Sequence, residues 1–163
     1  MPHRFVAGFA LMLGLLAACQ PALNWREVRP AQSGAVALFP CKPDVEQRAG
    51  MGLVQCEAAG SRFALSWADT PDAAQAGAAL KAMAQALAAK LGQPLPPAQP
   101  LQVAGMTPLP EAGQHRLGGD GAATRVAVFA HGGRVYQAVM SGARDDAPAW
   151  EAFIAGLRVE PAR

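Results

Sequence analysis

The chain has 163 residues, a length that fits one domain, and its 14 basic and 12 acidic side chains leave a formal net charge of +2 at pH 7. Binding to nucleic-acid phosphates requires a basic patch, and the sequence contains none, so a nucleic-acid partner is excluded. Apolar residues make up 52% of the chain. They recur with helix and strand periods, which is typical of a folded domain rather than a disordered chain.

The first residues have the pattern of a signal peptide. After a short basic start at His3 and Arg4, residues 5–16 contain no charged or strongly polar side chain. This apolar segment is too short for a transmembrane helix, which needs about 20 residues. It is followed by Ala-Ala-Cys, so that Leu16 and Cys19 enclose two small residues.

This ending resembles the lipobox of bacterial lipoproteins. The resemblance implies that residues 1–18 are removed, that the Cys19 thiol receives a diacylglycerol and that the new amino group is acylated. Several acyl chains together anchor a protein stably in a membrane. An ordinary signal peptide followed by a coincidental cysteine is the alternative.

The residue after the cysteine is Gln20. In enterobacterial lipoproteins an Asp at this place retains the protein in the inner membrane. The resemblance therefore favours a lipoprotein of the outer membrane that faces the periplasm, with the inner membrane as the alternative.

The mature chain is expected to consist of a tether, residues 19–33, and one domain, residues 34–160. Few apolar side chains and two prolines occur in the tether, which predicts an extended segment between lipid and domain. Arg26 and Arg29 lie within it. They are expected either to contact anionic headgroups, at about 1 kcal/mol each, or to be solvated.

Three strands are predicted in the first half of the domain. Residues 35–39 are apolar and end before Pro40, which cannot donate a ladder hydrogen bond. Residues 53–56 and 62–67 form the next two. Aromatic and aliphatic residues alternate along the third strand and so share one face.

A long helix is predicted after the third strand. Thr70 is the expected cap, Pro71 suits the first helical position, and Gly92 followed by Pro94 ends the helix. Apolar residues at spacings of three and four define the face expected to pack on the sheet: Leu80, Met83, Leu87 and Leu91.

A proline-rich loop, a short strand over residues 101–106 and a hairpin are expected next. The hairpin joins residues 124–130 to residues 134–140 through a Gly-Gly turn, which places Phe129 opposite Tyr136. An aromatic helix and a closing strand follow. The residues predicted to form the core are Trp67, Leu80, Leu87, Phe129, Tyr136, Trp150 and Phe153.

Taken in order, these segments resemble the Mog1/PsbP-like fold, an α+β sandwich in which an antiparallel sheet is flanked by two helices. Residues 39–43 read Phe-Pro-Cys-Lys-Pro, where relatives often have Phe-Pro-Gly-Lys-Pro, and residues 134–137 read Arg-Val-Tyr-Gln. The long helix and the aromatic C-terminal helix complete the resemblance. Members of this family bind a small GTPase or a photosystem, so the resemblance implies non-catalytic binding without naming a partner.

Cys41 stands where relatives usually have Gly, and its one available partner is Cys56. Because cysteines in small exported domains usually pair, we predict a disulfide that adds about 3 kcal/mol in the chain-entropy model. A simple hairpin would place Cys41 nearer residue 52, so the bridge requires an asymmetric connection. Two buried free thiols are the alternative, and the spacing excludes a Cys-x-x-Cys redox site.

Catalytic and metal-binding signatures are missing from the sequence. His115 and His131 are interpreted as surface residues, with a ligand or base as the alternative for His115. No clustered carboxylates accompany them, so no metal or other cofactor is expected. The glycine-rich residues 118–121 lack the lysine and helix of a phosphate loop. Helix capping explains Asp145 and Asp146. No catalytic residue is assigned, and the chain is predicted not to be an enzyme.

Three functions remain to be distinguished. The first is a lipid-anchored, non-catalytic binding or scaffolding domain that recognises another protein of the cell envelope. The second is a carrier or sensor of a small apolar ligand held between the alanine-rich helix and the sheet. The third is an enzyme assembled from residues distant in sequence, whose sign would be a concave site with perturbed ionisable groups.

Overall fold

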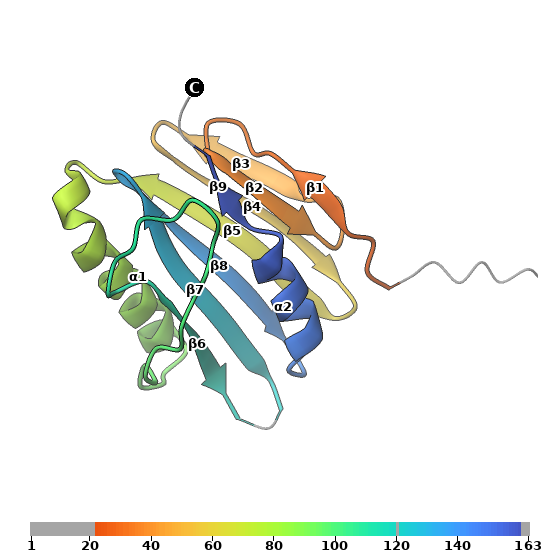
Figure 1. The fold of residues 1–163 in the computed structure, drawn as a ribbon. Helices are drawn as coiled ribbons and strands as arrows, with labels where there is room; N and C mark the ends of the chain where they lie inside the picture. The colour runs from red at the N-terminus through yellow and green to blue at the C-terminus, as the bar shows by residue number, and fades with distance from the viewer. Residues whose placement is uncertain (1–21, 120, 161–163) are drawn as a thin grey trace, which may run out of the picture.

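A central antiparallel sheet organises the structure, a computed structural model that describes residues 22–119 and 121–160. Its strands are β3 (Asp44–Arg48), β4 (Met51–Ala58), β5 (Ser61–Asp69), β6 (Gly113–Gly118), β7 (Ala123–His131) and β8 (Arg134–Gly142). They lie in the order β3-β4-β5-β8-β7-β6, so β3 and β6 are the edges (Figure 1). The expected antiparallel sheet is therefore present.

A smaller sheet brings together the two ends of the described chain. In it β1 (Arg26–Val28) pairs with β2 (Ala35–Phe39), and β2 pairs with β9 (Arg158–Val159). This sheet lies over one face of the central sheet together with α2 (Ala147–Ala155), as Figure 1 shows. The helix α1 (Ala76–Lys90) covers part of the other face.

The core on the α2 side is aromatic. Phe153 is completely buried, and its ring centroid lies 5.3 Å from that of Phe39 and 5.5 Å from that of Phe63. The Trp150 indole N–H donates to the Gln114 side-chain oxygen at 2.8 Å. Six of the seven predicted core residues are buried, and the seventh, Leu87, is partly buried.

The predicted hairpin is present with the predicted register. Phe129 lies opposite Tyr136, and their rings stack at 5.1 Å between centroids. Residues 126–130 of β7 are all buried, because α1 packs on one face of this strand and the aromatic core on the other.

The start of α1 differs from the sequence prediction. A short 3-10 helix, η1 (Ala73–Gln75), precedes it, and the Asp72 carboxylate accepts a hydrogen bond from the Ala74 N–H at 2.9 Å. The expected cap, Thr70, instead donates its hydroxyl to the Gly133 carbonyl at 2.8 Å. Thr70 therefore connects the loop before the helix to the β7–β8 turn by a hydrogen bond.

The packed face of α1 is narrower than predicted. Its buried positions recur every four residues: Ala76, Leu80, Ala84 and Ala88. Alanine at three of these four positions lets the helix lie close to β7 and β8. Met83 and Leu87 are therefore at the margin of the contact, and Leu91 is exposed.

The predicted strand over residues 101–106 is not formed. Leu101 and Val103 are buried, but this segment pairs only through an isolated bridge between Ala104 and Arg158. The chain turns at Gly105, whose φ is 84° and whose Cβ position would lie 2.2 Å from the Val159 carbonyl oxygen. Only glycine fits this close approach.

The predicted boundary between tether and domain at residue 34 is wrong. The Asn24 N–H donates to the Pro40 carbonyl at 2.8 Å, and the Trp25 and Phe63 rings pack in a T-shaped arrangement with their centroids 6.0 Å apart. Residues from Asn24 onward therefore belong to the folded unit. Three apolar side chains of this segment pack against the core: Leu23, Trp25 and Val28. Their spacing follows no sustained period, so the sequence did not predict these contacts.

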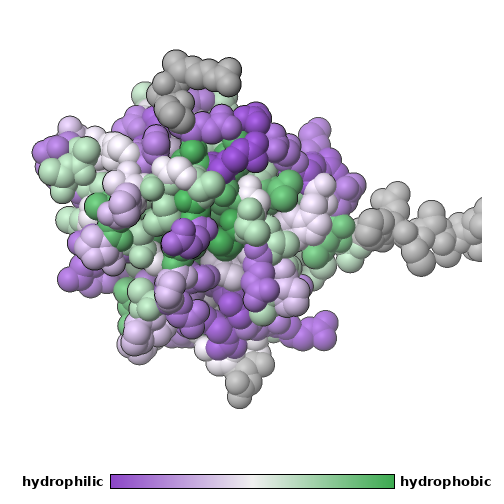
Figure 2. Space-filling model, in the orientation of Figure 1, coloured by the Kyte–Doolittle hydropathy of each residue, from purple (hydrophilic) through white to green (hydrophobic). Residues whose placement is uncertain are grey.

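The predicted signal peptide, residues 1–18, and Cys19 lie outside the described residues. Within the part of the chain that the structure describes, no helix combines the length and the apolar character needed to cross a membrane. Hydrophobic residues on the face shown in Figure 2 gather near its centre and are surrounded by hydrophilic ones.

Candidate functional site

In the part of the chain that the structure describes, α1 covers one side of a face of the central sheet and leaves the other side of that face open. The main contacts of α1 with the sheet are made by β7 and β8, which leaves β3, β4 and much of β5 open on that side (Figure 1). Strand register pairs Leu53 with Ser66 and Met51 with Ala68, and these residues share the open face.

A groove of about 360 Å³ lies on this open surface beside α1. Met51 and Leu53 of β4 line it together with Met83 of α1, while Glu46 and Arg48 come from the edge strand β3. We call this feature the sheet groove. Met51 is 50% exposed, and flexible thioether side chains adapt to differently shaped apolar partners. The sheet groove is therefore suited to contacting an apolar group flanked by charges.

The carrier hypothesis placed its ligand in a different position. It required a cavity between the alanine-rich helix and the sheet, but the sheet-facing alanines of α1 are buried in the contact with the sheet: Ala76, Ala84 and Ala88. The hollow on this face lies beside the helix instead of beneath it. Short side chains here shorten the distance between helix and sheet and do not leave room for a ligand.

A second hollow, of about 430 Å³, lies where β5 ends and β8 begins. Asp69 and Arg134 form an ion pair across it at 2.6 Å, and this hydrogen bond lowers the pKa of the Asp69 carboxyl. The Tyr136 hydroxyl donates to the Ser33 carbonyl at 2.7 Å, and burial raises its pKa to about 12. These groups hold the structure together and do not form a pair of nucleophile and base.

The two histidines of the described domain lie in separate structural contacts. His115 is only 8% exposed, and its Nδ1 lies 2.8 Å from the Pro96 carbonyl, so its interpretation as a surface residue is wrong. The proline-rich loop folds back over β6 and covers this side chain. His131 is at the hairpin corner, with Nδ1 2.7 Å from the Gly105 carbonyl. Residues 22–119 and 121–160 contain no cluster of three or more His, Cys, Asp or Glu that could hold a metal.

Asp145 has a role that the sequence did not reveal. Asp146 alone caps α2, accepting from the Ala149 N–H at 3.0 Å. Asp145 instead contacts Arg125 at 2.6 Å and Arg116 at 2.8 Å. The hydrogen bond from Arg125, with a smaller contribution from that of Arg116, holds the pKa of the Asp145 carboxyl well below its usual range. This cluster ties β6 and β7 to the start of α2.

We expect Asp145→Asn to lower the free energy of unfolding by about 1–3 kcal/mol at pH 7, the usual cost of losing hydrogen bonds to a charged group. Because the pKa is depressed in the folded state, this stabilisation is complete above the unfolded-state pKa of about 3.9 and is lost as pH falls through the folded-state value. Urea unfolding between pH 7 and pH 2 tests this. The free energies of unfolding of Asp145→Asn and of the unmodified protein should approach each other below about pH 4. Asp146→Asn is the control, since Asn caps a helix as well as Asp does. If Asp145→Asn lowered the free energy of unfolding by the same amount at all pH values, the ion-pair role of Asp145 would be contradicted.

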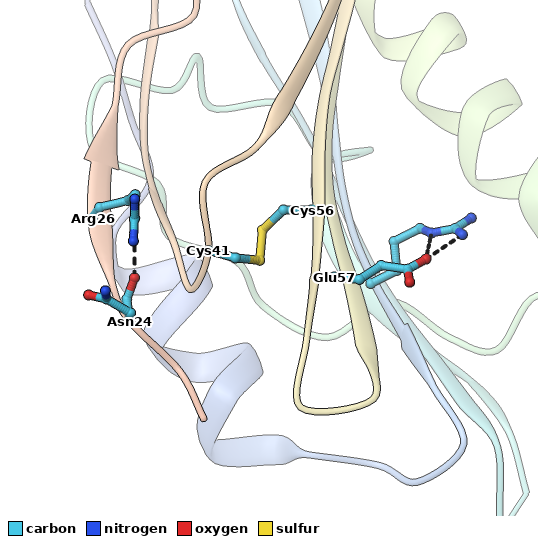
Figure 3. The surroundings of a disulfide bond; sticks show 6 residues. Asn24, Arg26, Cys41, Cys56 and Glu57 are labelled. Carbon is cyan, nitrogen blue, oxygen red and sulfur yellow. Dashed lines mark hydrogen bonds and ion pairs between the residues drawn. A yellow bond between two sulfur atoms is a disulfide. The ribbon is translucent and has the colours of Figure 1, made fainter. Parts of the chain in front are cut away.

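The predicted disulfide is present (Figure 3). Cys41 and Cys56 are bonded, with their Cα atoms 6.0 Å apart. The strand β3, which the sequence did not predict, lengthens the hairpin so that Asp44 lies opposite Gln55. This register brings the segment before β3 beside the end of β4, which supplies the asymmetry that the bridge requires.

Comparison with known proteins finds likeness in structure only, since the sequence matches no protein-family model and no curated sequence. The solution structure of cyanobacterial PsbP (CyanoP) from Synechocystis sp. PCC 6803 is similar with a TM-score of 0.51 and 13% identity, over 90% of this chain and 98% of that one. A Bacteroides thetaiotaomicron protein has a TM-score of 0.46 and 11% identity over 77% of this chain, which spans 45% of its length. The likeness to CyanoP shows a PsbP-like fold and confirms the α+β class predicted from the sequence.

Proposed function

We propose that this chain is a lipid-anchored lipoprotein of the cell envelope whose periplasm-facing domain binds another envelope protein without catalysing a reaction. The lipobox-like segment ending at Cys19 supports the anchor. The sheet groove carries the proposal for binding, because it leaves the half-exposed Met51 and the adjoining sheet face open to a partner.

The chemistry of the sheet groove favours a protein partner. Beside its apolar lining lie an acidic and a basic side chain of the edge strand β3, Glu46 and Arg48. A polypeptide segment that presents an apolar side chain between opposite charges complements this surface. The Ser66 hydroxyl in the groove donates to the Gln137 carbonyl at 3.5 Å, and among the described residues it forms no hydrogen bond with a His, Asp or Glu side chain. This arrangement supports binding rather than catalysis.

A small apolar ligand is the second candidate occupant of the same groove. Its volume of about 360 Å³ falls within the range of small-molecule sites, about 300–1,000 Å³. A carrier would then hold its ligand beside α1 on an open surface. Native mass spectrometry of the purified protein distinguishes the two functions, because only a carrier retains a small molecule.

We expect a photo-crosslinking residue at Met51 to give one discrete crosslinked product in intact cells. The same residue at Gln85, on the exposed side of α1, should not give that product. Reversing a groove charge with Arg48→Glu should reduce the Met51 product if the partner is recognised as proposed. The crosslinks are measured by immunoblotting and mass spectrometry. Identical patterns from both positions would contradict a binding role for the sheet groove.

We expect Cys19→Ser to abolish lipid attachment, because only the thiol at this position can receive the diacylglycerol. Metabolic labelling with an alkyne fatty acid measures the attachment. Cys41→Ser is the matched control and should keep the label, since Cys41 belongs to the domain. Equal labelling of the Cys19→Ser protein and the unmodified protein would rule out the lipoprotein assignment.

A further inference from the structure

The length of chain between the lipid site and the folded domain is very short. Asn24 is held by its hydrogen bond to Pro40, and β1 begins at Arg26. Only five residue steps separate Cys19 from Asn24, and a fully extended chain covers about 18 Å in that length. A lipid on Cys19 therefore cannot lie far from the folded surface around Asn24.

The chain enters the domain at one particular end of the central sheet. The disulfide places Cys41, next to Pro40, beside the end of β4, and Figure 3 shows Asn24 at this same end. Strand register aligns Ser61 with Gly142, and Gly142 with Ala123. The turns at residues 59–60 and 121–122 and the segment 143–146 therefore also lie at this end, which we call the proximal end. The opposite, distal end comprises the turns at residues 49–50 and 132–133.

The two arginines of the predicted tether, Arg26 and Arg29, lie toward opposite ends of the central sheet. Arg29 forms ion pairs with Glu27 at 3.1 Å and with Glu160 at 3.2 Å, toward the distal end. Arg26 lies at the proximal end and is exposed, as is Lys42. Neither forms an ion pair with a carboxylate of the described residues. Both cations are therefore available to lipid headgroups.

The surface of the proximal end is compatible with close contact. Its turns carry small side chains, including Ala58, Ala59 and Ala122. Trp25 is only partly buried where the chain enters, and an indole with one apolar and one polar edge suits the boundary between lipid and water.

We propose that the domain lies with its proximal end directly against the bilayer surface, held there by the short connection to Cys19. Phospholipid headgroups contact this end, and the distal turns point away from the membrane. This inference rests on the lipid anchor of the proposed function. Met51 of the sheet groove follows the distal turn at residues 49–50. In this orientation Met51 points away from the membrane, where a partner in the periplasm can reach it.

The orientation can be tested with the full lipidated protein in vesicles of phosphatidylethanolamine and phosphatidylglycerol. With Cys19 acylated and the other two cysteines bonded, an introduced cysteine is the only free thiol. Ala59→Cys and Ala49→Cys are a matched pair, since both residues are exposed and each precedes a glycine in a hairpin turn. A fluorophore at each position is quenched by lipids that carry a nitroxide on the headgroup.

We expect several-fold stronger quenching at Ala59→Cys than at Ala49→Cys. Insertion of about 20 Gly and Ser residues between Pro21 and Ala22 should remove most of this difference, because such a linker is flexible. Equal quenching at the two positions, stronger quenching at Ala49→Cys, or a difference that survives the insertion would overturn the proposal. Flotation with the vesicles is measured first: a protein that does not float lacks the anchor, which refutes the proposed function separately.

Discussion

Phe153→Ala is expected to lower the free energy of unfolding by about 3–5 kcal/mol, the usual cost of removing a buried aromatic side chain. The Phe153 ring is completely buried between Phe39 of the small sheet and Phe63 of the central sheet. Its removal leaves a cavity where three elements meet. For a domain with a total stability of about 5–15 kcal/mol, this loss is a large fraction.

Urea unfolding followed by tryptophan fluorescence measures this effect, because Trp150 lies in the same helix at 6.2 Å between ring centroids. Glu151→Ala is the control on the exposed side of the same helix. It should change stability by no more than about 0.5 kcal/mol. Equal effects of the two substitutions would mean that α2 is not docked through Phe153.

Replacing both cysteines of the disulfide, Cys41→Ser with Cys56→Ser, is expected to cost about 3 kcal/mol. The bridge spans a sequence separation of 15 residues, and closing a loop of this length removes about that much chain entropy from the unfolded state. The bond joins the segment after β2 to β4, so the unfolded chain gains freedom in the region that connects the two sheets.

The double variant should unfold at lower urea concentration with little change in its folded circular dichroism spectrum. The unmodified protein treated with a reductant supplies the comparison. Reduced protein and double variant should have similar stability, because both lack the same cross-link. A double variant as stable as the oxidised protein would show that the bridge adds nothing to the fold.

Periodicity predicted the parts of the fold in which side chains alternate or recur strongly. The facing residues Phe129 and Tyr136 followed from the Gly-Gly turn, and the C-terminal helix followed from its aromatic spacing. The edge strand β3 was missed because all five of its residues are exposed and four of them are polar. An edge strand that packs on nothing has no apolar pattern to detect.

The sheet groove could not be predicted from the sequence, because it is formed by elements that only the tertiary structure brings together. The sheet groove combines β3, β4 and β5 with Met83 of α1, and its location depends on which strands the helix leaves uncovered. Strand order is a property of the whole fold, so no local motif indicated it. The Asp145 cluster likewise joins side chains 20 and 29 residues apart in sequence. By contrast, the cysteine pairing was predicted from composition and from the compartment that the lipobox resemblance implies.

The pairing of β2 with β9 sets a condition on when the domain can be completed. Ala35 lies opposite Val159, so the small sheet cannot close until β9 is available to pair with β2. Because a chain is synthesised from its N-terminus, the apolar strand β2 has no β9 partner until residues 40–159 have followed it. Contacts so distant in sequence slow folding and prolong the exposure of unpaired strand edges. We therefore expect the newly made chain to depend on a holding chaperone until β9 is available.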